Sequence, residues 1–398
     1  MTIPPQEKLS DYTIRVANPS QAEQHVRGAF AIWHKGTTWE EFSEVGRRER
    51  EETEWGRDGA FLTWVLVRSD DVEDDIYAGC ETYRRRGWVK RKGSNDVEDG
   101  YIYGIASVIT PKQHLRNGYA TRLLSLLHHE LGPSATIPSL PREWGMEPSI
   151  PSDVSPKVPK AIGSILWSDV GSKFYSKCKM SVDRPGWVVE DSQNTELVWK
   201  IIPPSSAQPL DENVDWLYKE DFASIGEEIG SSIKQKLKKT DTSERSIFVH
   251  DPATPGLLSF VPVRGSWSRP SLENKPIGLR IRSSTGDSAD DTIVLFALLN
   301  LSIGSRFMIT LVHNLKSSQL PTVLQALDSL ATEAGHKEGW VWDLGLSGDL
   351  VEAWKNQPGR EVVAKRRDEI GGHLLGVAWY GAEEEKGEMI KGEMWTWC

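Results

Sequence analysis

The stretch "ITPKQHLRNGYATRLLSLLHHEL", residues 109–131, joins the end of an apolar run to an amphipathic segment through a turn that contains a glycine. The apolar residues after the turn recur at helical spacing, at Ala120, Leu123, Leu124, Leu127 and Leu131. This spacing predicts a helix that packs one face on a sheet, and the run before the turn, "GYIYGIASVIT", predicts the strand that leads into it. The order strand, turn, helix organises the first half of the chain.

The turn itself predicts an anion site. A turn that ends a strand and begins a helix directs several unpaired N–H groups at one point, where the helix dipole adds partial positive charge. A phosphate is the most natural occupant, and Arg116 and Arg122 on either side favour it. Plain turn chemistry also places a glycine at such a corner, so the turn alone leaves both interpretations open.

Around this turn the sequence predicts a first domain, residues 1–203. A strand at 12–16 and helices at 20–35 and 37–51 precede strands at 60–71, 75–91 and 100–110; Ser20, with Glu23 three places later, is the expected N-cap. Seven prolines between residues 133 and 159 predict a loop or lid, because proline disfavours both helix and inner strand. A strand at 161–168, a short helix at 169–178 and strands at 186–191 and 196–202 lead to a linker at 203–212.

The second domain, residues 204–398, repeats part of this order. It is predicted to contain a helix at 215–237, a strand hairpin at 292–301 and 306–314 around Ser302–Ser305, a helix at 320–335, a strand at 339–347 and a helix at 348–356. The junction "VHNLKSSQLPTV" at 312–323 has no glycine, and Pro321 removes a backbone donor near the helix start. A degenerate copy that cannot hold a pyrophosphate is therefore expected, with an unrelated αβ domain docked for stability as the alternative.

Composition narrows the class of protein. The net charge of −10 argues against nucleic-acid and anionic-membrane partners, which need a basic surface, and favours a cationic or neutral partner. The three cysteines are too few and too far apart for a disulfide framework or a CxxC metal site, which indicates a reducing compartment. The start "MTIPPQEKLSDY" lacks a secretory signal pattern, and the longest apolar run, 292–304, is too short to span a bilayer. We expect a cytoplasmic protein and leave the oligomeric state open.

The histidines and tryptophans give little further indication of function. His34, His128 and His129 have no second ligand at metal spacing, so no metal site is predicted and all three are interpreted as surface or capping residues. The 17 tryptophans follow no period, which favours bulky core positions and pocket walls.

The predicted βααβββα order, the turn "RNGYA" and the later "SILWSDVGSKFY" resemble the Gcn5-related N-acetyltransferase (GNAT) superfamily, which binds acetyl-CoA. In the family's pyrophosphate loop, Gln/Arg-x-x-Gly-x-Gly/Ala, Gly118 and Ala120 match the last two fixed positions. Leu115 stands where Gln or Arg is usual, and Arg116 follows one place late. "CETYRR", "GIASVITP", "NGYATRL" and "SDVGSKFY" resemble, in register, fungal lysine N6-acetyltransferases of lysine catabolism.

The resemblance covers residues 12–200 well and the remainder loosely, through the length and the "WTWC" ending. It implies an α+β protein in which a GNAT fold, with a mixed and mostly antiparallel sheet flanked by helices, occupies residues 1–203. A second, degenerate GNAT-like αβ lobe would follow in residues 204–398. That lobe would close the amine side of the substrate cleft, with the 133–159 loop and the Trp395–Cys398 tail as walls.

The resemblance also implies site residues. The pyrophosphate would be bound by Arg116, Asn117, Gly118, Tyr119, Ala120 and Thr121. Val108 and Ile109 would pair with pantetheine through their backbone groups, as an added strand does. Tyr175 matches the tyrosine that the superfamily often places near the CoA sulfur, where a phenol can protonate the leaving thiolate. A core tyrosine on a short helix is the alternative.

Glu81 alternates with Cys80 and Thr82 on a predicted central strand, so one of them points into the cleft. A buried carboxylate there could fix a substrate ammonium or relay its proton through water, whereas a salt bridge to Arg84 or Arg86 is as plausible. The basic run "RRRGWVKRK", 84–92, is expected to be a solvated hairpin tip, with contact to CoA phosphates as the alternative.

Together these expectations describe an enzyme that moves an acetyl group from acetyl-CoA, its co-substrate, to the amine of a small cationic metabolite, with free lysine as the leading acceptor. Direct transfer is favoured over an acetyl-cysteine, because no cysteine has a neighbouring His and Asp arrangement. Acetylation of another small amine, such as a polyamine or a secondary-metabolite intermediate, remains open. So does a non-catalytic acyl-CoA-binding GNAT module, which Leu115 slightly favours and Tyr175 opposes.

Overall fold

The first of two sheets is built around the long hairpin of β3 (Ala78–Lys90) and β4 (Val97–Ile109). β1 (Tyr12–Val16) and β2 (Phe61–Arg68) extend it antiparallel on one side. On the other side β5 (Gly163–Ser168) runs parallel to β4, after the crossover helix α3 (Tyr119–Leu131). The computed structural model describes residues 8–34, 36–73, 75–148, 150–204, 213–267, 270–272, 274–298, 306–342 and 346–398.

The second sheet has the same plan. β8 (Val214–Leu217), β10 (Gly278–Ile281), β11 (Thr292–Ala297) and β12 (Arg306–His313) pair antiparallel in this order. β13 (Glu338–Trp342) runs parallel to β12 after helix α6 (Leu320–Glu333). Three further helices belong to this lobe: α4 (Phe222–Lys239), α5 (Phe260–Ser266) and α7 (Gly348–Lys355). The turn predicted at Ser302–Ser305, and most of the linker predicted at 203–212, lie outside the described residues.

Each half of the chain contributes a strand to the sheet that is built mainly by the other half. β7 (Thr195–Lys200) pairs with β13 in the second sheet, with β14 (Val363–Arg366) beyond it. In return β15 (Leu374–Trp379) pairs with β5 in the first sheet, with β6 (Val188–Val189) beyond it. Within the described residues the two orders match strand for strand, β1-β2-β3-β4-β5-β15-β6 and β8-β10-β11-β12-β13-β7-β14. The boundary near residue 203 stays a prediction, but both sheets are built across it.

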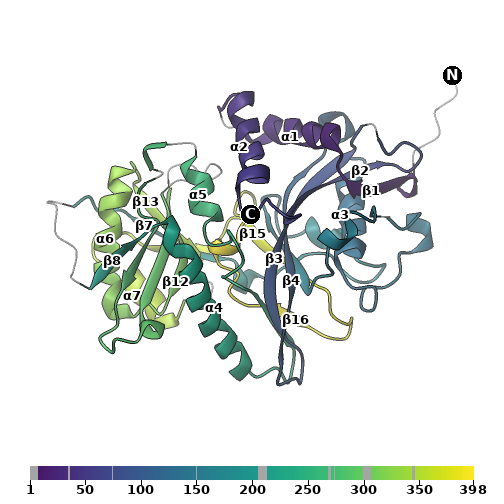
Figure 1. The fold of residues 1–398 in the computed structure, drawn as a ribbon. Coiled ribbons are helices and arrows are strands. Elements are labelled where there is room, and N and C mark those ends of the chain that lie inside the picture. The colour runs from purple at the N-terminus through teal and green to yellow at the C-terminus, as the bar shows by residue number, and fades with distance from the viewer. Residues whose placement is uncertain are drawn as a thin grey trace.

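Two further strands, β9 (Ser246–His250) and β16 (Gly387–Met389), pair with each other, and β9 also pairs with β3. The two lobes lie side by side, with Cys398 between them (Figure 1). The predicted α+β class, with a mixed and mostly antiparallel sheet in each of two similar lobes, is confirmed.

Helices α1 (Pro19–Trp33) and α2 (Trp39–Glu52) confirm the two predicted N-terminal helices. The N-cap of α1 is Asn18 rather than Ser20, because the Asn18 side chain accepts from Gln21 N and the Gln21 side chain accepts from Asn18 N. The predicted helix at 215–237 starts only at Phe222, since residues 214–217 pair with β10 as a strand.

The predicted short helix at 169–178 is wrong. The chain turns there instead, and only Tyr175–Lys177 form a 3-10 turn. Gly171 explains the difference, because its φ of +89° lies in the left-handed region and interrupts any right-handed helix. Tyr175 therefore lies in a turn and not on a helix, and its position is set by the tertiary fold.

His128 is fully buried, not at the surface as predicted. Its ring lies 2.9 Å from the Tyr380 hydroxyl and 3.1 Å from the Cys178 carbonyl, and the Tyr380 hydroxyl in turn meets Ser164 Oγ at 2.8 Å. Burial lowers the pKa of His128 to about 3, so the ring is a neutral member of an internal network that ties β5 and the end of β15 to α3. His34 is exposed at the C-cap of α1, as predicted.

Tryptophans fill the space between the lobes. Trp167 of β5 and Trp342 of β13 lie with ring centroids 4.6 Å apart, and the Arg367 guanidinium stands 4.2 Å from the Trp342 centroid. The same core contains further aromatic rings: Trp55, Phe61, Tyr83, Phe248, Phe260, Trp340, Trp379 and Trp397. Bulky rings therefore join the two sheets.

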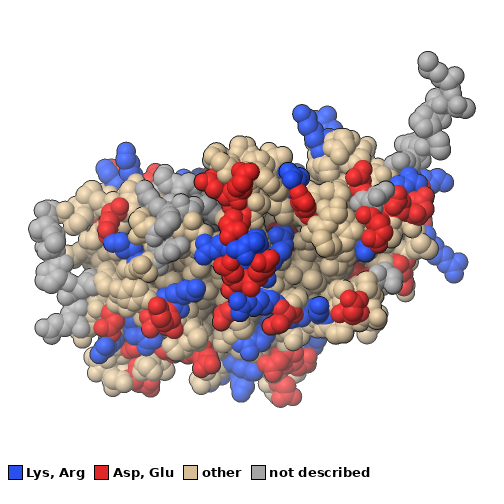
Figure 2. Space-filling view, turned by 45° about the horizontal axis from the view of Figure 1, so that its top comes forward, with Lys and Arg blue, Asp and Glu red and all other residues tan. Residues whose placement is uncertain are grey.

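Acidic and basic side chains are interspersed over the face drawn in Figure 2, consistent with the modest excess of acidic residues in the sequence. Among the helices that the structure describes, none has both the length and the apolar character of a membrane span.

Candidate active site

The turn before α3 has the geometry that the sequence predicts. Gly118 is the N-cap of α3 with φ +82°, and Arg116 also takes a left-handed φ of +67°. No side chain caps this helix start, so the first amides of α3 are presented to whatever lies at the turn. Asn117 closes the turn by donating to the His114 carbonyl at 3.3 Å.

The side chains around the turn play different parts. Arg116 and Leu115 are exposed, and Ala120 and Thr121 are half-buried. The Tyr119 ring is buried among Tyr12 and Tyr77 and also packs against His114 of the turn, with ring centroids 5.8 Å apart. Arg122 does not flank a phosphate, because its guanidinium is buried and donates to the Tyr12 carbonyl at 3.0 Å.

β4 and β5 part at the level of this turn. Their pairing ends at Ile105 and Leu166, while β4 continues to Ile109 and β5 to Ser168. A bulge in β4 lies at the same place, since Gly79 of β3 opposes Ile109 and Glu81 opposes Ala106, and Ser107 takes φ +49°. Beyond Ile105, the edge of β4 that faces β5 makes no strand pairing within the described residues.

The predicted pantetheine residues lie in this parted segment. Val108 is half-buried, and Ile109 is buried against Gly28 of α1, where a Cβ would stand 2.3 Å from Ile109 Cδ1. An extended, strand-like ligand arm fits the parted edge, and a phosphate fits the uncapped helix start beside it. The described residues are thus compatible with acetyl-CoA.

Tyr175 packs in the core that also contains Cys80 and α3. Its ring contacts Phe174 at a centroid distance of 5.0 Å. Burial raises the pKa of this phenol above its ordinary value, so it remains a protonated donor.

Glu81 points to the opposite face of β3 from Cys80, toward α1 and α2. Its Oε1 atom lies 3.8 Å from His25 Nδ1 and 3.6 Å from Arg50 Nη2, and its side chain is 12 % exposed. The predicted alternative, a salt bridge to Arg84 or Arg86, is wrong. Arg84 donates to the carbonyls of Lys157 and Asp58, and Arg86 pairs with Asp251 at 3.2 Å.

A second carboxylate stands near Glu81. Glu49 of α2 is buried and pairs with Arg264 of α5, Nε to Oε1 at 2.8 Å. Burial and the neighbouring Glu81 raise the pKa of Glu49, whereas Arg264 opposes the rise. Aromatic walls surround the group, since Tyr83 packs on Phe61 and Phe260 with centroid distances of 4.9 and 5.3 Å.

The Trp395–Cys398 tail reaches this region shortly after β16, which joins the first sheet through β9. The turn at Met394–Thr396 packs on β12, and the Arg85 guanidinium donates to the carbonyls of Thr396 and Trp397. Cys398 then lies against β4, where a Cβ on Gly104 would stand 2.7 Å from Cys398 Sγ. The tail thus lies between the lobes, next to β4 and to β3, the strand that carries Glu81.

The run 84–92 is mostly strand rather than a hairpin tip, because β3 extends to Lys90. Lys90 Nζ donates to the carbonyls of Lys238 and Thr240, and Arg91 pairs with Glu98. These cations hold the hairpin and α4 together.

The sequence alone predicted no role for His25, Arg50, Glu49 or Arg264. One signal was present for His25, since Gln21, His25 and Ala29 follow one another at four-residue spacing and form the buried stripe of α1. A buried polar residue needs a hydrogen-bond partner, so its position on this stripe predicts a specific contact. Arg264 came from a helix, α5, that the sequence did not predict.

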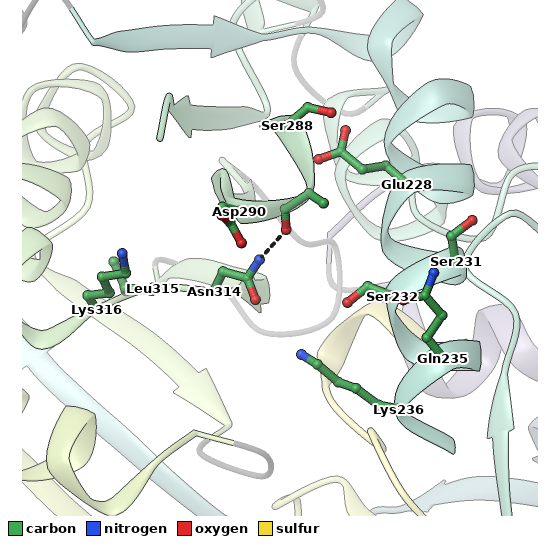
Figure 3. Close-up of a pocket in the computed structure, with 11 residues that line it drawn as sticks. Glu228, Ser231, Ser232, Gln235, Lys236, Ser288, Asp290, Asn314, Leu315 and Lys316 are labelled. Atoms are coloured by element: carbon green, nitrogen blue, oxygen red, sulfur yellow. Dashed lines mark hydrogen bonds between the residues drawn. The ribbon is translucent and has the colours of Figure 1, made fainter. Parts of the chain in front are cut away.

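The second lobe contains a separate groove of about 590 Å³. Figure 3 shows α4 side chains on one side and Asn314–Lys316, after β12, on the other. Asn314 closes the groove floor by donating to the Ala289 carbonyl at 3.0 Å. The groove is lined by Glu228, Ser231, Ser232, Gln235, Lys236, Ser288, Ala289, Asp290, Asn314, Leu315 and Lys316. None of the predicted site residues lines it.

Among the described residues, no group of three or more His, Cys, Asp or Glu side chains is placed to hold a metal ion. No protein-family model matches the chain, and no curated protein matches it significantly.

Solved structures with distant similarity to this chain include the following three. The GCN5-related N-acetyltransferase from Kribbella flavida is 12% identical, with 93% of this chain and 72% of that chain covered and a TM-score of 0.47. The GCN5-related N-acetyltransferase from Anabaena variabilis is 12% identical, over 92% and 72%, with a TM-score of 0.45. A probable N-acyltransferase from Enterococcus faecalis is 10% identical, over 93% and 73%, with a TM-score of 0.45. At these identities and TM-scores the likeness is too distant to assign a function to this chain.

Proposed function

We propose that this protein is an N-acetyltransferase that moves an acetyl group from acetyl-CoA to the amine of a small cationic metabolite, with free lysine as the leading acceptor. The observation that carries the proposal is the uncapped start of α3 at Gly118, placed where β4 parts from β5. A pyrophosphate at the helix start would let the pantetheine arm follow the free edge of β4 at Val108 and Ile109.

The acceptor would enter from the face of the first sheet that carries Glu81. Glu81 and Glu49 supply negative charge there, and the rings of Phe61, Tyr83 and Phe260 supply apolar walls, which suits a cationic amine with an alkyl chain. Tyr175, from the opposite face, would protonate the leaving thiolate as its general acid. The thioester carbonyl would lie between the two faces, at the parted end of β4 and β5.

An acetyl-CoA-dependent thiol-release assay tests the proposal. The purified protein is mixed with acetyl-CoA and a panel that contains lysine, ornithine, a polyamine and an uncharged primary amine. Saturable thiol release with small cationic amines is expected, fastest with lysine. Release that favours the polyamine would support acetylation of a different small amine.

One observation favours a second candidate, an acyl-CoA-binding module without turnover. Leu115 is 54% exposed at the place where the resembled family has a polar side chain, so a polar side-chain contact to the cofactor would be absent there. Acetyl-CoA binding in calorimetry, together with no thiol release for any amine, would favour this candidate.

A further inference from the structure

His25 of α1 is buried with one ring nitrogen satisfied and the other without a partner. Its Nε2 atom lies 3.0 Å from the Ser107 carbonyl at the bulge of β4. Because a carbonyl oxygen only accepts, Nε2 must carry the hydrogen, and the neutral ring then has its lone pair on Nδ1. Nδ1 is buried and has no hydrogen-bond partner among the described residues.

That lone pair faces a carboxylate. Glu81 Oε1 is 3.8 Å from Nδ1, and two acceptors that face each other cannot bond without a donor between them. The neighbouring cation does not supply it: Arg50 Nη2 lies 3.6 Å from Glu81 Oε1, within ion-pair range, but is itself buried without a hydrogen bond among the described residues. Buried polar atoms without partners are costly, so such a cluster favours binding of a group that can donate hydrogen bonds.

The position of the cluster identifies the kind of ligand. His25 is fixed to Ser107, two residues beyond the last pairing of β4 with β5, so the acceptor pair stands at the parted edge. An ammonium group carries several N–H donors and a positive charge, and would satisfy both Nδ1 and the Glu81 carboxylate. A carboxylate or phosphate ligand would face two acceptors and be repelled.

We propose that His25 and Glu81 together receive the reacting nitrogen of the acceptor amine and that His25 Nδ1 takes its proton; this rests on the proposed acetyl transfer. One ammonium proton passes to Nδ1 and then to solvent, and the freed lone pair forms the C–N bond to the acetyl carbon as the C–S bond breaks. The nitrogen loses a second proton as the amide forms, and this balances the proton that the CoA thiolate gains. Glu81 stabilises the imidazolium and orients the nitrogen.

The groups facing His25 set its protonation. Burial lowers the pKa of His25 below its ordinary 6.5, the Glu81 carboxylate from β3 and the Ser107 carbonyl from β4 oppose this, and the Arg50 guanidinium from α2 adds to it. A lowered pKa keeps Nδ1 free to accept a proton at neutral pH. Activity that depends on His25 should therefore fall only as the pH drops below 6.5.

The test is His25→Gln, whose amide can still donate to the Ser107 carbonyl but cannot take a proton. We expect kcat for lysine to fall by roughly a hundredfold, unchanged acetyl-CoA affinity, and loss of the acid limb of the kcat/KM profile. His34→Gln, at the exposed end of the same helix, is the matched control and should keep the wild-type profile. Glu81→Gln should raise KM for the amine as well as lower kcat. Wild-type kcat and an unchanged acid limb in His25→Gln would overturn the assignment.

A second measurement covers a variant that does not fold. In wild-type protein labelled with ¹⁵N-histidine and saturated with a non-reactive acetyl-CoA analogue, added lysine should shift the His25 Nδ1 resonance. A resonance that stays in place while the amine binds would overturn the proposal. If the wild-type enzyme acetylates no amine in the panel, the proposed function itself has failed, which is distinct from an active enzyme that ignores His25.

Discussion

Arg264 of α5 lies 2.8 Å from Glu49 of α2, Nε to Oε1, so an ion pair links the second lobe to the first beside the candidate acceptor site. Glu49 is buried, whereas the Arg264 side chain is 32% exposed. The pair therefore has one end in the core and one near solvent. The buried Glu49 carboxylate therefore depends on Arg264 for a compensating positive charge.

Arg264→Ala should destabilise the protein by about 2 kcal/mol at pH 7, below the 3–5 of a fully buried pair because Arg264 is partly exposed. Without Arg264 the pKa of Glu49 rises further above its unfolded value of about 4.3, so the loss should be largest at neutral pH and fade as the pH falls toward that value. Urea unfolding at pH 7 and pH 5 measures both. Adding Glu49→Gln should restore part of the loss, and a loss independent of pH would contradict the account.

Gly118→Glu should abolish acetyl-CoA binding, because it places a negative side chain where the pyrophosphate would lie. Gly118→Ala is the matched control, since it carries the same strain at φ +82° without the charge, and its Cβ would meet only the flexible Leu9 side chain at 3.2 Å. Calorimetry should show loss of affinity for Glu and near wild-type affinity for Ala. Equal acetyl-CoA affinity in both variants would show that the turn does not bind the pyrophosphate.

Tyr175→Phe should lower kcat by roughly a hundredfold with little change in acetyl-CoA affinity or stability, because the ring packing against Phe174 is kept. Tyr103→Phe is the control, a buried tyrosine whose hydroxyl donates to the Pro159 carbonyl at 3.0 Å. It should cost about 1 kcal/mol of stability and leave turnover intact. Steady-state kinetics and thermal unfolding distinguish a loss of turnover from a loss of stability. Wild-type turnover in Tyr175→Phe would show that Tyr175 has only a packing role.

A fragment of residues 1–203 should fail to fold alone. It lacks β15, which pairs with both β5 and β6, and its β7 has no second sheet to join. Circular dichroism and a thermal scan of the fragment should show no cooperative transition, whereas co-expression with residues 204–398 should restore one. A stable fragment that binds acetyl-CoA would show that the exchanged strands are dispensable.

The first lobe was largely predictable because its signals are local. The period of α3, the glycine turn and the alternating strands around Glu81 each follow from a few neighbouring residues. The exchange of β7 and β15 was not predictable, since strands that pair with partners more than a hundred residues away in the chain show no sign of that pairing in their local periodicity. The Glu49–Arg264 pair was not predictable for the same reason, since its residues lie 215 positions apart. The left-handed φ of Gly171 has no local signal in a segment whose other residues are compatible with a helix.

Wild-type protein with acetyl-CoA and lysine tests the central claim most directly, when the release of CoA thiol and the formation of N-acetylated lysine are followed in the same reaction. The account predicts that both products appear in equal amounts, that they require the amine, and that Gly118→Glu removes both. Bound acetyl-CoA with neither product, for lysine or for any other small cationic amine, would contradict it.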